Sequence, residues 1–364
     1  MAITKEDVFL ALSKVQEPDL KEDLVTLNMI KDVEVNDRKV SFTVVLTTPA
    51  CPLKELIKKN CTDAIHTALG IDVEVEINLT ANVLAGRNNS PLLPNVKNII
   101  AVASGKGGVG KSTVTTNLAI ALARSGAKVG LIDADISGPS IPVMFGVENA
   151  HPLVEVIEGK NYITPIEQYG VKMISIGFLT PAESAVIWRG PMASSALKQF
   201  ISDTKWEDLD YLLIDMPPGT SDIHLTLVQT VPVTGVVIVT TPQKVALADA
   251  AKGLNMFVQA QINVPVLGVV ENMSYFTPAE LPDNKYHIFG KGGGKALAEA
   301  NGVPFLGEIP LVQSIRESGD AGRPAVLSDD ITANAFKDLA SSVAQQVAIR
   351  NSTKSQTKPV ELKV

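Results

Sequence analysis

Cysteine is scarce in this sequence of 364 residues, which contains only Cys51 and Cys61. Two cysteines exclude a disulfide scaffold and, within one chain, a metal site built from four thiolates. Apolar runs are short as well, since none approaches the roughly 18–20 residues needed to cross a bilayer. The opening residues, MAITKEDVF, carry charges where a signal peptide would have an apolar core. We therefore expect a cytoplasmic protein that has no membrane partner.

Positive charge is in deficit, with 32 Lys and Arg residues against 39 Asp and Glu residues and a formal net charge of −7. This balance argues against broad binding of nucleic acid, which depends on neutralising phosphates. Hydrophobic residues make up 45% and charged residues 20% of the chain, as is typical of globular proteins. The length leaves room for two or three domains of about 100–200 residues each.

The pattern of apolar residues divides the chain into a small α+β domain, a linker rich in Asn and Pro, a larger domain and a polar tail. The small domain combines a helix after the N-cap Thr4, a hairpin and a second helix over 52–69. The four predicted parts cover residues 1–85, 86–97, 98–350 and 351–364.

In the larger domain, short and almost continuously apolar segments alternate with helical patterns. Continuous apolar runs are typical of strands buried on both faces, and hence of a mainly parallel sheet flanked by helices. The predicted fold class is therefore α/β, preceded by a small α+β domain. The predicted strands are Ile99–Ala103, Val129–Asp133, Met173–Ile176, Tyr211–Asp215, Gly235–Thr240, Val266–Val270 and Phe305–Ile309.

A glycine-rich loop follows the first of these strands and precedes a predicted helix. Its residues fit the pattern G-x-x-x-x-G-K-[ST] in the strand–loop–helix context of a phosphate loop. Glycines bring backbone N–H groups against phosphate oxygens, and the helix N-terminus adds partial positive charge. We expect Lys111 to reach the β- and γ-phosphates and the Ser112 hydroxyl to bind Mg²⁺. The predicted nucleotide contacts are Gly105, Lys106, Gly107, Gly108, Val109, Gly110, Lys111, Ser112 and Thr113.

Acidic residues stand at the ends of two other predicted strands. Asp133 and Asp135 follow one of them, and Asp215 ends another before Met-Pro-Pro-Gly-Thr. Ligands of open α/β sheets bind at the carboxyl ends of the strands, so these carboxylates are expected near the phosphate loop. We expect Asp133 and Asp215 to hold Mg²⁺, and Asp135 and Asp215 to act in catalysis. The alternative for each residue is the capping of a turn.

With Lys106 directly after its first glycine, the phosphate loop resembles that of the deviant Walker A class of ATPases. In that class, this additional lysine crosses a dimer interface and contacts the partner's nucleotide. The resemblance implies a homodimer that binds ATP and Mg²⁺, with Lys106 and Lys111 acting in hydrolysis.

Within this class, the sequence most resembles the Mrp/ApbC/Nbp35 family of iron–sulfur cluster carrier ATPases. Residues 1–85 resemble the MIP18-type (DUF59) domain that is fused to bacterial members. The resemblance implies a P-loop NTPase fold, delivery of clusters to apo client proteins together with the cluster assembly machinery, and contact of Asn272 with adenine. The matching stretches are Thr48–Pro52, Asp133–Ser140, Leu213–Asp222, Thr240–Gln243, Glu271–Ser274, Ile309–Leu311 and Asp320–Pro324.

One departure from this family concerns the ligands of the cluster. Members usually carry a Cys-x-x-Cys pair shortly after Glu-Asn-Met-Ser, and two chains share a [4Fe–4S] cluster through four thiolates. Residues 271–290 contain no cysteine, so this site cannot form. Asp283 and His287 are candidate substitutes, although a lone exposed histidine in a Pro-rich loop is more often solvated.

Cys51 is the best-placed thiol if a cluster is held through thiolates. Pro52 suits the first position of a helix, which makes Cys51 the predicted N-cap. The helix dipole and free N–H groups would there lower its pKa and favour the thiolate. The alternative is an inert, half-buried cysteine beside a turn. Cys61 aligns with the apolar face of the same helix and is predicted to lie in the core.

A second glycine-rich segment and a histidine are predicted to have structural roles. The segment Gly290–Lys295 looks like a second phosphate loop, but it lacks the Gly-Lys-[Ser/Thr] ending, which favours a lid or turn. His224 is predicted to pack within a helix.

Two other functions remain open for this sequence. A ParA/MinD-like spatial-partitioning ATPase would need a basic face or a terminal amphipathic helix, which the polar tail does not supply. A non-catalytic assembly scaffold would use nucleotide only to hold the dimer together. A turnover assay with and without apo-target protein separates that scaffold from an ATPase.

Overall fold

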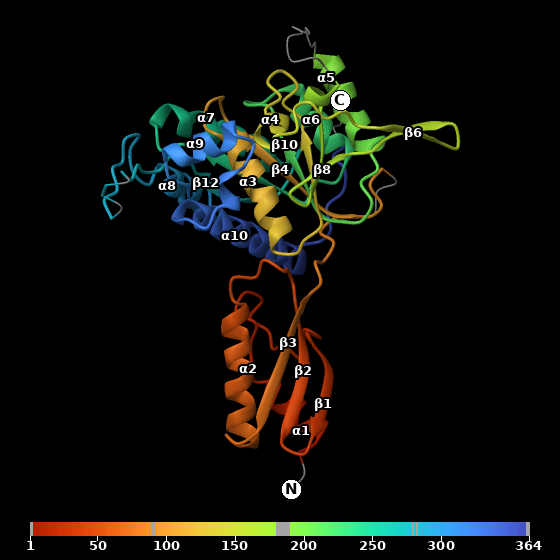
Figure 1. The fold of residues 1–364 in the computed structure, drawn as a ribbon, viewed down its shortest axis with the longest axis vertical. Coiled ribbons are helices and arrows are strands. Elements are labelled where there is room, and N and C mark those ends of the chain that lie inside the picture. The colour runs from red at the N-terminus through yellow and green to blue at the C-terminus, as the bar shows by residue number, and fades with distance from the viewer. Residues whose placement is uncertain (1–2, 89–91, 180–189, 279, 282, 362–364) are drawn as a thin grey trace. The chain divides into compact units, whose positions relative to one another are not determined.

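The computed structural model describes residues 3–88, 92–179, 190–278, 280–281 and 283–361 (Figure 1). Part of the predicted linker and the last residues of the predicted tail lie outside these ranges. The chain forms two compact units. The small unit comprises Met1–Leu84 with Ala348–Lys354, and the large unit comprises Ala85–Val347 with Ser355–Val364. Within the described ranges, no helix combines the length and the apolar character that a membrane span requires.

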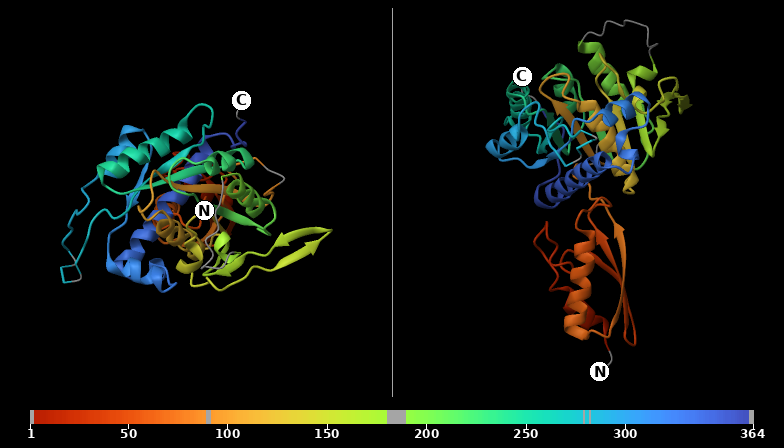
Figure 2. Two further views of the ribbon diagram at one scale, coloured as in Figure 1. Left: turned by 90° about the horizontal axis from the view of Figure 1, so that it is seen from above. Right: turned by 60° about the vertical axis from the view of Figure 1, so that its left-hand side comes forward.

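The small unit packs two helices against a three-stranded sheet (Figure 2). Thr4 is the N-cap of the first helix, and its hydroxyl accepts a hydrogen bond from the N–H of Asp7, as predicted. The sheet order is β1-β2-β3, with β1 antiparallel and β3 parallel to β2. The elements are α1 (Lys5–Leu12), β1 (Ile30–Asn36), β2 (Lys39–Leu46), α2 (Lys54–Leu69) and β3 (Glu74–Ala81).

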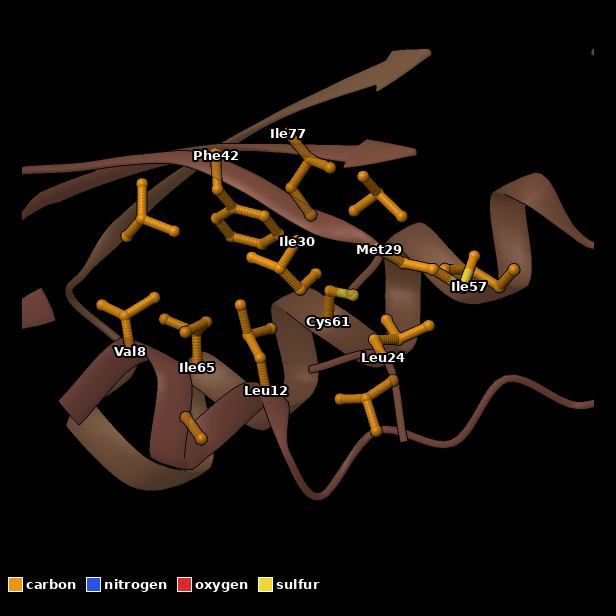
Figure 3. Packing of buried hydrophobic residues seen from close by; sticks show 14 of the residues in the cluster. Val8, Leu12, Leu24, Met29, Ile30, Phe42, Ile57, Cys61, Ile65 and Ile77 are labelled. Carbon is orange, nitrogen blue, oxygen red and sulfur yellow. The ribbon is translucent and has the colours of Figure 1, made fainter. Parts of the chain in front are cut away.

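The core of the small unit lies between these helices and the sheet. Figure 3 shows Cys61 pointing from α2 into the apolar cluster, among side chains such as Leu12, Leu24 and Ile30. Cys61 is completely buried, which confirms its predicted place in the core. Alternate residues of β2 are buried against the helices, as expected for a strand with one face on a core.

The large unit is built on an eight-stranded sheet with the order β13-β12-β11-β4-β10-β5-β9-β8. Every neighbouring pair is parallel except β8 with β9, so the predicted mainly parallel sheet is confirmed. The central strands β4, β10 and β5 end at one edge, which brings the phosphate loop and the strand-end acids together. The strands are β4 (Val96–Ser104), β5 (Val129–Asp133), β8 (Ile166–Gln168), β9 (Val171–Ser175), β10 (Leu209–Asp215), β11 (Gly235–Thr240), β12 (Val266–Glu271) and β13 (Phe305–Glu308).

Helices cover both faces of this sheet (Figure 2). Helix α3, which follows the phosphate loop, packs on β4, β5 and β10, whereas α7 packs on β4, β11 and β12. The helices are α3 (Lys111–Arg124), α4 (Ile141–Met144), α5 (Gly190–Ser202), α6 (Asp222–Thr230), α7 (Lys244–Val258), α8 (Gly293–Ala300), α9 (Gln313–Asp320) and α10 (Ile331–Thr353), with 3₁₀ turns at Ile176–Phe178 and Ala325–Leu327.

A two-stranded hairpin of the large unit was not predicted. Its strands, β6 (Val154–Ile157) and β7 (Lys160–Ile163), pair antiparallel and extend away from the eight-stranded sheet (Figure 1). All four residues of β6 are exposed, so no buried face marks this strand in the sequence.

The predicted polar tail is more structured than its composition suggests. Helix α10 continues to Thr353, and the N–H of Thr357 then donates to the carbonyl oxygen of Gly86 at 3.1 Å. Arg87, from the predicted linker, is buried, and its guanidinium donates to the carbonyl oxygens of Val96 and Leu93. Hydrogen bonds of the backbone and of a buried guanidinium thus order parts of the linker and of the tail, although their polar composition predicts little structure.

Candidate nucleotide-binding site

The glycine-rich loop connects the end of β4 with the start of α3. Gly108 and Gly110 have φ values of +79° and +78°, a region that other residues rarely adopt. Gly105 packs against α7, where an added Cβ would lie 2.1 Å from the carbonyl carbon of Asp249. Backbone conformation therefore demands glycine at two positions of the loop, and close packing demands it at a third.

The loop borders a cavity of about 210 Å³ at the N-terminus of α3. Every residue of the loop that was predicted to contact nucleotide lines this cavity, except Gly105, which packs against α7 instead. Asp135 and Pro218, from the loops after β5 and β10, also line it, together with Ser104, Ser140 and Met144. The first N–H groups of a helix have no partner within the helix, which makes such a cavity suitable for an anion.

Lys111, Ser112 and Asp215 meet beside this cavity. The Nζ atom of Lys111 lies 2.8 Å from Oδ2 of Asp215, whose side chain is fully buried. The Ser112 hydroxyl donates to the same oxygen at 2.6 Å and accepts from the Lys111 ammonium at 3.1 Å. Residues predicted from the phosphate loop and from the end of a separate strand thus form one hydrogen-bonded cluster.

Asp133 lies next to Asp215 in the register of the sheet and is also fully buried. Its Oδ1 accepts a hydrogen bond from the N–H of Asp135 at 3.2 Å. Its Oδ2 accepts from the hydroxyl of Ser175 at 2.9 Å and from the N–H of Ile141 at 3.4 Å. Burial and then repulsion from Asp215 raise the pKa of Asp133. Both oxygens of Asp133 thus hold the loop after β5 or the neighbouring strand β9, and the binding of Mg²⁺ by Asp133 stays a prediction.

Asp135 occupies a different environment. It is half-buried and lines the cavity of the phosphate loop. Burial raises the pKa of this carboxyl group, and the positive charge of Lys111 opposes the shift. Asp135 is therefore available to the cavity in a way that Asp133 is not.

The donor groups around this cavity fit a Mg²⁺–nucleotide complex. Mg²⁺ prefers hard oxygen ligands and usually keeps several waters, and Ser112 and Asp215 offer a hydroxyl and a carboxylate. The loop amides and Lys111 supply the donors and the positive charge that phosphate requires. These residues would hold the metal and the phosphates respectively.

A second cavity, of about 510 Å³, shares Gly110 and Thr113 with the first. Its lining is largely apolar, as suits the faces of an aromatic base. Asn272 lies in this lining, and its side-chain amide donates to the carbonyl oxygen of Val109 at 2.8 Å. A role was predicted for Asn272 but for none of the apolar residues of this lining, which include Val143, Met144, Met273, Leu311, Val312 and Ile315.

Lys106 is half-buried in the loop, where its carbonyl oxygen accepts a hydrogen bond from the Ser104 hydroxyl at 3.0 Å. Across the described ranges, no carboxylate forms an ion pair with its ammonium group. Within the described residues, the Lys106 ammonium group is thus not held by an ion pair.

The prediction that Cys51 caps a helix is wrong. Helix α2 begins at Lys54 with Leu53 as its N-cap, because a turn held by Thr48 takes up the preceding residues. Cys51 is 8% exposed, and burial raises its pKa instead of lowering it. Burial also raises the pKa of Cys61 to about 12. Neither thiol is suited to hold a resident cluster.

The other candidate cluster ligands do not assemble either. His287 has its Nδ1 atom 3.2 Å from the carbonyl oxygen of Ser274, and Asp283 is exposed. Across the part of the chain that the structure describes, no three His, Cys, Asp or Glu side chains are grouped so that they could hold a metal ion.

The remaining features have structural explanations. The segment Gly290–Lys295 leads into α8, where the N–H of Gly294 donates to Oε2 of Glu271 at 2.5 Å. A carboxylate of the protein thus occupies the place at this helix N-terminus where a phosphate would bind. Glu271 belongs to the matching stretch Glu271–Ser274, but no role was predicted for it. His224 is 1% exposed within α6 and forms a capping box with Ser221, which confirms that it packs in a helix.

The fold and the residues around the loop define a P-loop nucleotide-binding protein. A family profile described as NUBPL iron-transfer P-loop NTPase matches residues 95–347, and one described as iron-sulfur cluster assembly protein matches residues 5–77. The chain belongs to this family of iron-transfer P-loop NTPases, and its N-terminal part belongs to the assembly-protein family. The resemblance to cluster carrier ATPases with a MIP18-type domain is thereby confirmed.

Similar proteins and structures agree with this assignment. The iron-sulfur cluster carrier protein of Synechocystis sp. is 48% identical over 351 residues, which cover 95% of this chain and 99% of that protein. A nucleotide-binding protein from Archaeoglobus fulgidus in complex with ADP is 39% identical with a TM-score of 0.54, over 64% of this chain and 88% of that chain. The cell division ATPase MinD of Pyrococcus furiosus is 26% identical with a TM-score of 0.50, over 68% of this chain and 98% of that chain.

Proposed function

We propose that this protein binds ATP with Mg²⁺, hydrolyses it as a homodimer and delivers iron–sulfur clusters to apo client proteins. The observation that carries the proposal is the cluster of Lys111, Ser112 and Asp215 beside the cavity of the phosphate loop. The ADP complex of the Archaeoglobus protein supports nucleotide binding, and the name of the Synechocystis protein supports the carrier role.

The residues of the loop would bind and orient the triphosphate. Backbone amides and Lys111 would hold the phosphate oxygens, while Ser112 and Asp215 would hold Mg²⁺. When bound, Mg²⁺ supplies positive charge that neutralises the β- and γ-phosphate oxygens. Asp135 would accept a hydrogen bond from the attacking water and orient it toward the γ-phosphate. Catalysis at this site is therefore mainly positioning and electrostatic stabilisation.

Lys106 would act on the nucleotide of a second copy of the chain. This role follows from the family resemblance, and it agrees with an ammonium group that forms no ion pair within the described ranges. A cation supplied in trans makes hydrolysis depend on dimerisation.

The adenine base would occupy the apolar cavity beside Asn272. The side-chain amide of Asn272 donates to Val109, which fixes the orientation of the carboxamide and turns its oxygen away from that carbonyl group. The base would lie between apolar side chains, as in most nucleotide pockets.

The cluster is cargo in this proposal and not a resident cofactor. Because Cys51 and Cys61 are buried with raised pKa values, thiolates from client proteins or from the assembly machinery would supply most cluster ligands. Such an arrangement suits transient handling during transfer better than storage.

Two other functions make different predictions. The similarity to MinD of P. furiosus reflects a shared fold, and a spatial-partitioning role would require nucleotide-dependent binding to DNA or lipid. A non-catalytic scaffold would bind nucleotide and dimerise without turnover.

The first test compares two lysine variants. Lys111→Ala should nearly abolish binding of a fluorescent ATP analogue, because it removes the cation that faces the phosphates. Lys106→Ala should retain binding but lose hydrolysis and ATP-dependent dimerisation. Lys128→Ala, at an exposed position outside the loop, serves as the control. Equal loss of binding in the Lys106 and Lys111 variants would contradict a role in trans.

The second test concerns delivery. Wild-type protein, loaded anaerobically with iron and sulfide in the presence of a thiol donor, is mixed with an apo-ferredoxin and with ATP or no nucleotide. Faster appearance of holo-ferredoxin with ATP supports the carrier role. An unchanged rate, together with normal ATP turnover, would refute delivery while leaving the ATPase intact.

A further inference from the structure

Thr115 is a completely buried polar residue of the nucleotide site to which no motif points. It lies on α3, one helical turn after Lys111, so both side chains occupy the same face of the helix. Its Oγ1 atom is 2.7 Å from Oδ1 of Asp215 and 2.9 Å from the carbonyl oxygen of Lys111. The hydroxyl therefore stands between the helix backbone and the carboxylate at the end of β10.

The Thr115 hydroxyl can donate its single hydrogen to only one of these two acceptors at a time. A threonine hydroxyl has one hydrogen to donate, and a carbonyl oxygen and an ionised carboxylate can both only accept it. The distance to Asp215 is the shorter one, and hydrogen bonds to charged groups are the stronger kind. The hydroxyl is thus drawn from the carbonyl group, the usual partner of a helical threonine, toward Asp215.

The carboxylate of Asp215 is consequently held through both of its oxygens by the start of one helix. Thr115 binds Oδ1, and Ser112 and Lys111 bind Oδ2. A carboxylate fixed at one oxygen only could rotate about its χ2 angle, whereas one fixed at both oxygens presents Oδ2 to Ser112 in a single orientation. Because Asp215 is fully buried, no water would replace a donor that is lost.

We propose that Thr115 is a positioning residue that fixes the orientation of Asp215 and thereby raises the affinity of the site for the Mg²⁺–nucleotide complex. This inference rests on the proposed function, because it takes Ser112 and Asp215 as the groups that hold Mg²⁺. Residues that orient metal-binding carboxylates typically alter metal affinity by about 10–100-fold when they are replaced.

The chain offers a matched control in the next residue. Thr116 belongs to the same helix and is 1% exposed, but its hydroxyl faces the sulfur of Met144 at 3.5 Å and not a carboxylate. Thr116→Val removes a buried hydroxyl from the same turn without touching Asp215. Comparison of the two valine variants thus separates positioning of Asp215 from a general loss of helix stability.

The experiment titrates Mg²⁺ into full-length protein at a fixed concentration of fluorescent ADP and measures binding, not turnover. Thr115→Val should raise the Mg²⁺ concentration for half-maximal binding by about tenfold. Thr115→Ser, which restores a hydroxyl, should stay within about threefold of wild type, as should Thr116→Val. Binding of ADP in EDTA should be equal in all four proteins, since the loop amides and Lys111 are unchanged.

Equal half-maximal Mg²⁺ concentrations in Thr115→Val and wild type would overturn the proposal. So would a shift in Thr115→Val that Thr115→Ser fails to rescue or that Thr116→Val reproduces, because both results indicate a purely structural role. Melting temperatures identify variants that do not fold, and Thr115→Ala then replaces Thr115→Val. If wild type binds ADP with no dependence on Mg²⁺, the proposed function itself fails, which this series distinguishes from failure of Thr115 alone.

Discussion

His224 should make the folded protein sensitive to acid. The imidazole is 1% exposed in α6, and its Nδ1 atom accepts a hydrogen bond from the N–H of Ser221 at 3.2 Å. Within the described part of the chain, its Nε2 atom is buried without a partner. Burial lowers the pKa of His224 from 6.5 to about 4, although a hydrogen bond with the backbone of Ser221 opposes the shift; the charge of Lys111 lowers the pKa slightly further. Between pH 6.5 and pH 4, the unfolded chain therefore binds a proton at His224 that the folded protein does not bind.

The size of the effect follows from these two pKa values. Well above pH 6.5 the imidazole is neutral in the folded and in the unfolded state, so its protonation does not lower the free energy of unfolding there. As the pH falls from 6.5 toward 4, the unfolded chain binds the proton first, so the free energy of unfolding decreases. At pH 5 the unfolded histidine is almost fully protonated and the folded one is mostly neutral, which corresponds to a loss of about 2 kcal/mol relative to pH 7.

Urea denaturation of wild type and His224→Gln at pH 7 and pH 5 measures this contribution. Glutamine does not titrate, and it can take the same position in a capping box. The loss of stability between the two pH values should be smaller in His224→Gln by about 2 kcal/mol. The same pH dependence in both proteins would refute the assignment of a low pKa to His224.

Three other substitutions test the site and the fold. Asp135→Asn should lower ATP turnover at least about 100-fold while nucleotide binding persists, because catalysis depends on the charge that orients the attacking water. An unchanged rate of phosphate release would instead support the alternative role of Asp135, the capping of a turn. Gly105→Ala should lower the free energy of unfolding by about 1–3 kcal/mol, because its Cβ would lie 2.1 Å from the backbone of Asp249. Gly138→Ala, where a Cβ meets nothing within 4 Å, is the thermal-denaturation control. Cys51→Ser should retain as much iron and sulfide as wild type after anaerobic reconstitution; a clear loss would reinstate Cys51 as a ligand.

The large unit was predictable from sequence because its strands are buried on both faces. Each of the seven predicted strands corresponds to a strand of the eight-stranded sheet, since continuous apolar runs leave a strong signal. Strands β6 and β7 left none, because their residues are mostly exposed. The start of α2 was misplaced because the preference of Pro52 for a first helical position yields to the turn at Thr48.

The residues of the site that belong to a sequence motif could be predicted from the sequence. Lys111 and Ser112 follow from the loop pattern, and Asp215 follows from its place at a strand end. The contacts of Thr115, Ser175 and Glu271 depend on the register of strands and helices that are distant in sequence, so no pattern in one segment reveals them. The contacts of Asp133 could not be read from the sequence for the same reason, because its partners come from a neighbouring strand and from the loop after β5.

The location of both cysteines in the small unit has a practical consequence for spectroscopy. The large unit contains no thiol, and Cys51 and Cys61 are shielded and poorly ionised. A maleimide dye or spin label would therefore react with a cysteine introduced at an exposed position of the large unit far faster than with either native residue. Distances between two such labels could follow nucleotide-driven motions in an otherwise unaltered chain.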